Sequence, residues 1–172
     1  YMIGDFVRDK DAVSSCAMIA EAAAWAASQG KTIFNILQDI YLEFGFYLEG
    51  LLAVVKKGMS GADEIKKIME RFRNDPPQDV HGSRIILIND YEQSISRDLI
   101  SGEEKEIDLP KSNVLQFFLE DGSKISMRPS GTEPKIKFYI GVKDKLEKVE
   151  DYDKTYATLE TKIQAILDDL KL

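Results

Sequence analysis

The stretch from Val114 to Val142 restricts the fold most, because it contains three consecutive strand patterns with short connections. Val114–Leu119 and Ser123–Met127 have the composition of strands, and the Asp121-Gly122 pair between them is a strong signal for a tight hairpin turn. Lys135–Val142 then alternates polar and apolar side chains at the period of a strand. The stretch therefore predicts three antiparallel strands, whose apolar face needs a covering layer.

Two amphipathic helix patterns can supply that layer. The first follows Gly58–Gly61 and comprises Ile65, Ile68, Met69 and Phe72. The second, near the end of the chain, comprises Val149, Tyr152, Tyr156, Leu159, Ile163, Ile166 and Leu170. The second pattern also fits a short coiled-coil seam, but about three heptads is short for an independent coiled coil, and the sheet needs cover. We therefore expect the α+β class, with an antiparallel sheet flanked by helices.

The first part of the chain predicts two helices joined by a tight turn. One helix covers residues 11–29 and ends at Gly30, and the next begins after the N-cap Thr32 and ends at Gly45. Cys16 on the first helix is expected to be a small buried residue rather than a reactive thiol. The expected buried stripe of the second helix consists of Ile33, Leu37, Ile40, Tyr41 and Phe44.

The middle of the chain predicts two further strands, Leu51–Lys57 and Arg84–Asn89. The helix between them should stop at Asn74-Asp75-Pro76-Pro77, because proline cannot continue it. The polar span 90–113 is expected to be a long loop or an irregular hairpin.

Composition excludes several classes of function. The chain has 172 residues and a net charge of -7, which argues against a nucleic-acid partner. No apolar run approaches the roughly 18 residues that a membrane span needs, so no membrane partner is expected. The first residues do not resemble a signal peptide, and their abrupt start is expected of a piece of a longer protein. A single cysteine permits no internal disulfide, which fits the cytoplasm.

Histidine and cysteine offer no catalytic or metal-binding pattern. His81, the single histidine, follows two prolines and is expected at the surface. No spacing of histidine and cysteine is typical of a metal site.

The connection between the second and third predicted strands combines several donors suited to a phosphate group. Arg128 offers a forked, charged donor set, and Ser130 and Thr132 offer hydroxyl groups. Gly131 allows backbone N–H groups to approach a ligand closely. Lys137 would place another cation on the same face of the sheet as Lys135, two residues before it. Ordinary turn chemistry is the alternative, because Ser-Gly and Glu-Pro are common in turns.

Two motifs carry a resemblance to a known family. The run Arg128–Tyr139, Arg-Pro-Ser-Gly-Thr-Glu-Pro-Lys-Ile-Lys-Phe-Tyr, closely resembles the phosphate-binding loop in the last domain of the α-D-phosphohexomutases, particularly the phosphoglucomutase/phosphomannomutase type. Val7–Ala12 looks like the Arg-x-Lys-Asp segment of that family's third domain, and Tyr41–Gly45 is similar to its Tyr-x-x-Phe-Gly ending.

The resemblance implies a four-domain enzyme that moves a phosphoryl group between the 1- and 6-positions of a hexose through a bisphosphorylated intermediate. In that family a phosphoserine in the first domain and a Mg2+-holding loop in the second domain carry the chemistry. Neither lies in this chain, so we expect no activity from it alone and no catalytic residue in it. Residues 1–47 would be the end of the third domain, and residues 48–172 the fourth, a TBP-like fold.

The resemblance also assigns residues and partners. Arg128, Ser130, Gly131 and Thr132 would bind the phosphate that is not being transferred, with Lys137 assisting. Arg8 and Lys10 would lie at the substrate-facing edge of the third domain, or else be solvated charges before a helix. Glu133 is expected to pair with a basic neighbour rather than to contact the sugar. The partners would be a phosphosugar substrate and the upstream domains of the same polypeptide.

Two rival interpretations come from other classes of protein. The chain could be a non-catalytic module that binds phosphate without turnover, or an interaction domain that presents its last helix to a partner. An upstream nucleophile loop and an upstream metal loop in the full reading frame would favour the enzyme.

Overall fold

The computed structural model describes residues 4, 9–56 and 60–170, and the chain divides into two compact units. One unit contains Tyr1–Phe46 and Lys145–Tyr152, and the other contains Tyr47–Asp144 and Asp153–Leu172. The second unit contains most of the sheet and both helices that cover it.

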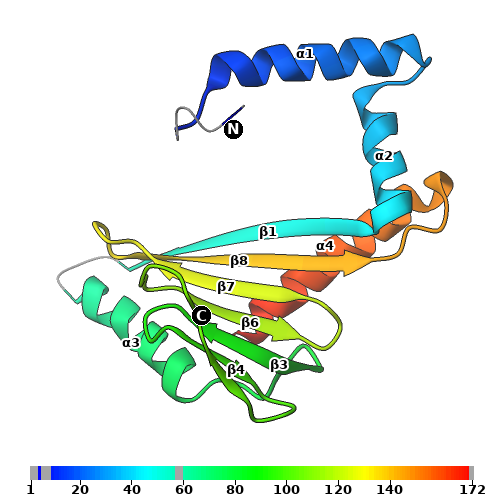
Figure 1. Cartoon of the computed structure of the whole chain (residues 1–172). Helices are drawn as coiled ribbons and strands as arrows, with labels where there is room; N and C mark the ends of the chain where they lie inside the picture. Colours follow the sequence, from blue (N-terminus) through cyan, green and yellow to red (C-terminus); the bar gives the residue numbers. More distant parts are fainter. Residues whose placement is uncertain (1–3, 5–8, 57–59, 171–172) are drawn as a thin grey trace. The chain divides into compact units, whose positions relative to one another are not determined.

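An antiparallel sheet forms the centre of the second unit (Figure 1). Its strands, in spatial order, are β1 (Phe46–Val55), β8 (Lys135–Asp144), β7 (Lys124–Pro129), β6 (Leu115–Leu119), β3 (Ser83–Asp90), β4 (Ile95–Asp98) and β5 (Glu104–Glu106). The short strand β2 (Asp79–Val80) pairs with β3. The consecutive antiparallel pairs of β6 with β7 and β7 with β8 confirm the predicted three-stranded core.

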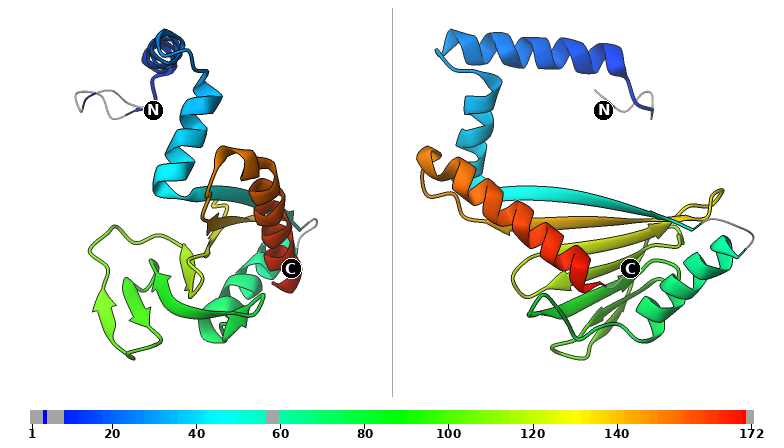
Figure 2. Two further views of the ribbon diagram at one scale, coloured as in Figure 1. Left: turned by 90° about the vertical axis from the view of Figure 1, so that its right-hand side faces the viewer. Right: turned by 180° about the vertical axis from the view of Figure 1, so that it is seen from behind.

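Two helices, α3 (Gly61–Asn74) and α4 (Tyr152–Asp169), cover one face of this sheet (Figure 2). The ring of Phe72 in α3 meets the rings of Phe117 and Phe138 edge-on, with centroids 6.2 and 6.1 Å apart. The fully buried strand residues on this face include Leu115, Phe117, Ile125, Met127, Ile136, Phe138 and Ile140. This arrangement confirms the predicted α+β class.

The terminal helix α4 packs against the sheet of its own chain, so the prediction of a covering helix, rather than a coiled-coil seam, is confirmed. Leu159, Ile163 and Ile166 are buried, and Ile163 lies so close to Gly50 of β1 that a Cβ at Gly50 would collide with it. The ammonium of Lys162 also forms a 2.7 Å ion pair with Asp121 in the β6–β7 turn. The helix is therefore a covering layer of the sheet.

One expectation for the strands needs correction. β1 begins at Phe46 rather than at Leu51, because Gly50 occupies a helix-facing position and so interrupts the apolar pattern. The polar span 90–113 contains the antiparallel strands β4 and β5, so the irregular hairpin, rather than the long loop, is confirmed there. The guanidinium of Arg97 and the carboxylate of Glu104 pair across them at 2.6 Å.

The first unit confirms both predicted N-terminal helices, α1 (Ala12–Ser28) and α2 (Ile33–Phe44). Thr32 and Asn35 form a reciprocal capping box at the start of α2. The rings of Tyr41, Phe46 and Tyr152 form one stacked cluster, in which the Phe46 centroid lies 4.2 Å from that of Tyr41 and 5.0 Å from that of Tyr152. These aromatic contacts join α2 to the segment Lys145–Tyr152 within this unit.

The expected burial of the first two helices is largely wrong. Cys16 is exposed, and Ile33, Ile40 and Phe44 of α2 are exposed as well. Among the residues that the structure describes, only Ala26 of α1 is buried. The reason is that the apolar sides of these helices find no covering layer within the described part of the chain.

Candidate functional site

The β7–β8 hairpin places Arg128 directly opposite Lys137. These two residues are Cα partners in the antiparallel register, as are Ser126 and Tyr139 one step further along. Because side chains alternate along a strand, and Met127 and Phe138 are buried under the helices, these four side chains lie on the opposite, open face of the sheet. The pairing register of β7 with β8 and the alternation of side chains along each strand thus bring the four polar side chains close together.

The loop between the two strands is held closed by its own backbone and by one hydroxyl. Ser130 N–H donates to the Lys135 carbonyl at 2.7 Å, which closes the loop at its base. The Ser130 hydroxyl oxygen accepts long hydrogen bonds from the N–H groups of Thr132 and Glu133, at 3.4 and 3.3 Å. The hydroxyl hydrogen of Ser130 therefore remains available for donation to a ligand.

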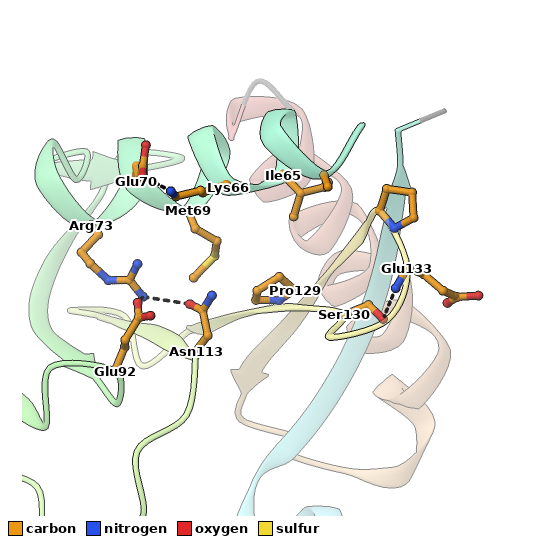
Figure 3. Close-up of a pocket in the computed structure, with 12 residues that line it drawn as sticks. Ile65, Lys66, Met69, Glu70, Arg73, Glu92, Asn113, Pro129, Ser130 and Glu133 are labelled. Atoms are coloured by element: carbon orange, nitrogen blue, oxygen red, sulfur yellow. Dashed lines mark hydrogen bonds and ion pairs between the residues drawn. The ribbon is translucent and has the colours of Figure 1, made fainter. Parts of the chain in front are cut away.

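Helix α3 supports the loop from behind (Figure 3). A pocket of about 360 Å³ lies between them, and Ile65 and Met69 point into it from α3 toward Pro129. A Cβ at Gly61 would collide with the Lys56 carbonyl, so only glycine allows α3 to begin this close to the loop. The Lys56 N–H in turn donates to the Pro134 carbonyl at 3.0 Å. These contacts fix the base of the loop.

The far end of the same pocket contains a largely buried ion pair. The guanidinium of Arg73 contacts the carboxylates of Asp90 at 2.7 Å and Glu92 at 2.9 Å. It also donates to the Asn113 side chain at 3.0 Å (Figure 3). This network ties the last turn of α3 to the end of β3 and to the segment that leads into β6.

A separate recess of about 230 Å³ opens on the other side of the loop. Its lining residues are Arg128, Pro129, Ser130, Gly131, Lys135, Lys137 and Tyr139. Three cationic side chains thus converge on one small volume, together with the hydroxyl-bearing side chains of Ser130 and Tyr139 and the backbone of Gly131. Such a donor-rich recess attracts an anion of the size of a phosphate.

Among the described residues, only one of these cations has a carboxylate partner. Glu133 pairs with Lys135 at 2.6 Å, which confirms the expected basic neighbour. The hydrogen bond and charge of Lys135, with a contribution from Lys137, hold the pKa of Glu133 below its ordinary value. Within the described residues, neither Arg128 nor Lys137 has a carboxylate at ion-pair distance. Within this part of the chain, neither cation is therefore neutralised by an acidic side chain.

The structure brings most, but not all, of the predicted site residues together. Arg128, Ser130, Gly131 and Lys137 line the recess, whereas Thr132 is exposed and is not among its lining residues. Arg8 lies outside the described residues. Lys10 is exposed, pairs with Asp9 at 3.0 Å, and belongs to the other unit. The roles of all these residues as ligands stay predictions.

Sequence reasoning did not assign Lys135 and Tyr139 to the site. The signal was present, because Lys135, Lys137 and Tyr139 alternate along one strand and so must share a face. His81 is exposed, as predicted, and its N–H donates to the Asp169 carboxylate at 2.7 Å.

Two features of the described residues bear on cofactors and membranes. No three histidine, cysteine or acidic side chains in this part of the chain are grouped so that they could hold a metal ion. None of its helices is both long and apolar enough to cross a bilayer.

Residues 54–159 match the family described as phosphoglucomutase/phosphomannomutase, C-terminal domain. The chain belongs to this family. The resemblance carried by the Arg128–Tyr139 run is thereby confirmed, because that run lies inside the matched region. The matched region also falls within residues 48–172, where we expect the family's last domain, although the boundary near residue 47 stays a prediction.

Curated relatives of this chain include two from staphylococci. The phosphoglucomutase of Staphylococcus aureus (strain MRSA252) is 40% identical over 138 residues, which cover 80% of this chain and 25% of the relative. The phosphoglucomutase of Staphylococcus haemolyticus (strain JCSC1435) is 35% identical over 150 residues, which cover 87% of this chain and 27% of that relative. The chain thus spans about a quarter of the length of these relatives.

Among solved structures, the phosphoprotein pp63/parafusin, a phosphoglucomutase from Paramecium in an open form, aligns with a TM-score of 0.44. It is 17% identical, and the alignment covers 81% of this chain and 23% of that one.

Proposed function

We propose that this chain is the C-terminal, phosphate-binding part of a phosphoglucomutase/phosphomannomutase that interconverts hexose 1-phosphate and hexose 6-phosphate through a bisphosphate intermediate. The observation that carries the proposal is the opposed pair of Arg128 and Lys137, two cations without carboxylate partners among the described residues, at the wall of a recess of about 230 Å³. Family membership supports the assignment to this reaction class.

Each group in the recess has a distinct task in holding a phosphate. Arg128 donates two parallel N–H bonds to phosphate oxygens, and a charge-assisted contact of this kind contributes about 1.5–3 kcal/mol. Lys137 supplies a compact positive charge from the opposite strand. The hydroxyl of Ser130 and the N–H of Gly131 complete the donor set, while Thr132 can reach a ligand only from the rim.

The bound phosphate is the one that is not transferred. By holding it, the chain orients the other end of the sugar toward groups elsewhere in the longer protein, and such positioning lowers the entropic part of the barrier. The phosphoryl-carrying serine and a Mg2+ ion, which would neutralise charge on the moving phosphoryl group, belong to upstream domains of the same cytoplasmic polypeptide. Arg8 and Lys10 would face the substrate from the third domain. This chain alone should not catalyse the reaction.

The test is a titration of the 172-residue chain with inorganic phosphate, followed by amide chemical shifts. Shifts should concentrate on Arg128, Gly131 and Lys137, and Arg128→Ala should weaken binding by about tenfold, the equivalent of one charge-assisted hydrogen bond. Arg97→Ala is the matched control, because the side chain of Arg97 on β4 is exposed and does not line the recess. Equal binding by the two variants would contradict the proposal.

A second measurement addresses the missing chemistry. Incubation of the purified chain with glucose 1-phosphate and Mg2+ should give no glucose 6-phosphate, because the phosphoryl donor belongs to upstream domains. Turnover by the chain alone would contradict that division of labour.

A further inference from the structure

The two outermost strands of the sheet differ in how well they are protected from pairing with another chain. Strand β5 has three residues, Glu104–Glu106, all of which are charged and exposed. Strand β1 at the other end has ten residues, Phe46–Val55, with a single charge at Glu49 and no proline (Figure 1). Short length, charge and proline are the features that keep an edge strand from pairing further. β1 is therefore the edge that can accept another strand.

The exposed side chains of β1 are mostly apolar. Tyr47, Leu51 and Val55 are 55, 57 and 56% exposed. They share the open face of the sheet, because side chains alternate along a strand and Gly50 faces α4. Among the described residues, no strand pairs with β1 on the side away from β8. The outer side of residues 47–55 thus combines backbone groups without a strand partner in this part of the chain with apolar surface.

A hollow of about 600 Å³ runs along this outer side. Residues 48–51 line it from β1, and Ile163 and Leu167 are among the residues that line it from α4. Consecutive residues of a strand point to opposite faces, so a hollow lined by four of them lies at the edge of the strand. Gly50 leaves space there, because no side chain stands between the strand and Ile163. The hollow can therefore receive an apolar side chain of an added strand.

We propose that β1 pairs antiparallel with β1 of a second copy of the chain, so that two sheets join across a twofold axis at Leu51. Among registers that match the two faces, this is the one that opposes all of residues 47–55 with one another. The contact is isologous, since each copy contributes the same surface. Assembly stops at two copies, because the remaining edge of each sheet is the charged strand β5.

The side chains that meet on the open face in this register are complementary. Tyr47 lies opposite Val55 of the second copy, and Leu51 lies opposite its own counterpart. Glu49 lies opposite Ala53, so the single charge of each strand meets no like charge. Aromatic, β-branched and other apolar pairs directly opposite one another stabilise a sheet, whereas like charges destabilise it.

The helix-facing side of the register fills the hollow. Leu52 of the second copy lies opposite Gly50, and its side chain occupies the space that the glycine leaves beside Ile163. A register about Gly50 would instead set glycine against glycine and leave the hollow empty. The burial of Leu52, which occurs twice in the dimer, therefore favours the axis at Leu51.

The test is sedimentation velocity of the 172-residue chain over a range of concentrations, which should show an equilibrium between monomer and dimer. Leu51→Lys sets two lysines opposite each other and should raise the dissociation constant of the dimer by at least about tenfold. Ala53→Lys is the matched control on the same face of the same strand. Its lysine lies opposite Glu49, so the dissociation constant should not rise. Thermal melts check that both variants stay folded.

Disulfide formation tests the register independently of affinity, in a Cys16→Ser background. Leu51→Cys should give a covalent dimer under mild oxidation, because opposed Cα atoms in an antiparallel pair are about 4.5–5.5 Å apart, within the range of a disulfide. Ala53→Cys should not. Its residue lies opposite Glu49, and the two introduced cysteines are about 13 Å apart along the strands.

Several results would overturn the inference. These are a chain that stays monomeric at all concentrations, equal dimerisation of Leu51→Lys and Ala53→Lys, and assemblies larger than two copies. A longer protein that is monomeric at concentrations where the chain is dimeric would show that an upstream segment covers β1, and the inference would fail. None of these results affects the proposed function, because residues 47–55 do not line the phosphate recess.

Discussion

Arg128 and Lys137 are cross-strand partners on β7 and β8, and both side chains lie on the open face of the sheet. Directly opposed side chains in an antiparallel pair have Cβ atoms only about 5 Å apart, and like charges at this distance destabilise the pair. The phosphate that we propose would lie between the two cations and remove that repulsion. Without it, the pairing of Arg128 with Lys137 has a small cost in the stability of the hairpin.

The first prediction concerns Arg128 in the longer protein. Arg128→Ala should lower kcat/KM for hexose 1-phosphate by at least about tenfold, through the lost charge-assisted contact and the poorer alignment of the substrate. Arg128→Lys should recover only part of this, because lysine keeps the charge but loses the fork. Steady-state kinetics and thermal melts should be measured together. A folded Arg128→Ala protein with unchanged kcat/KM would reduce the loop to an ordinary turn.

The second prediction concerns Glu133, whose carboxylate forms an ion pair with the ammonium of Lys135 at 2.6 Å. Glu133→Gln should free this cation and tighten the binding of inorganic phosphate by up to about fivefold, the value of an exposed ion pair. Calorimetric titration of the chain measures the change. Glu147→Gln is the control, because Glu147 pairs with Lys145 at 2.8 Å outside the recess. Weaker binding in Glu133→Gln would mean that the carboxylate organises the loop instead of competing with the ligand.

The third prediction concerns the ion pair that anchors α3. Arg73 is 12% exposed and its partner Asp90 8% exposed, so removal of the arginine leaves a charge uncompensated in a poorly solvated place. Arg73→Ala should lower the free energy of unfolding by about 3 kcal/mol, measured by urea denaturation. Arg97→Ala, which removes the more exposed pair with Glu104, should cost less than about 1 kcal/mol. Equal losses in the two variants would show that the Arg73 network contributes no more than a surface pair.

The fourth prediction is a pH dependence set by Asp121. Partial burial raises the pKa of this carboxyl, but hydrogen bonds from Lys162 and Ser123 outweigh burial, and the pKa is lowered on balance. A lowered folded-state pKa means that the stabilisation is fully present above the ordinary carboxyl pKa and is lost as the pH falls through the folded value.

Asp121→Asn should therefore be about 1 kcal/mol less stable than the unmodified chain at pH 7, and this difference should disappear in strong acid. Urea denaturation at a series of pH values measures it. Lys162→Met should flatten the same acidic part of the profile. A difference that persists unchanged below the folded-state pKa would assign the effect to packing rather than to charge.

Local patterns were sufficient for much of the fold. The helices ended by Gly30 and Gly45 and the hairpin at Asp121-Gly122 were predictable because caps and tight turns depend on a few adjacent residues. The limits of β1 were not predictable in this way. A side chain at position 50 would collide with Ile163, which lies more than a hundred residues later in the sequence, and this contact explains the glycine in that strand.

The exposure of the first two helices shows a similar limit. An apolar stripe indicates which face of a helix needs cover, but it does not indicate what covers it. Cys16 was expected to be buried on that basis, and it is exposed because no described element lies over its face of α1.

For the candidate site, the sequence by itself determined which donors are available, since Arg128, Ser130 and Gly131 are consecutive or nearly so, and their motif lies within the region that matches the family. The tertiary structure alone decided which of these donors share a recess. It set Arg128 against Lys137 and Ser126 against Tyr139, and it left Thr132 at the rim. The physical reason is that cross-strand register and the packing of α3 behind the loop depend on contacts between distant segments, which no local pattern encodes.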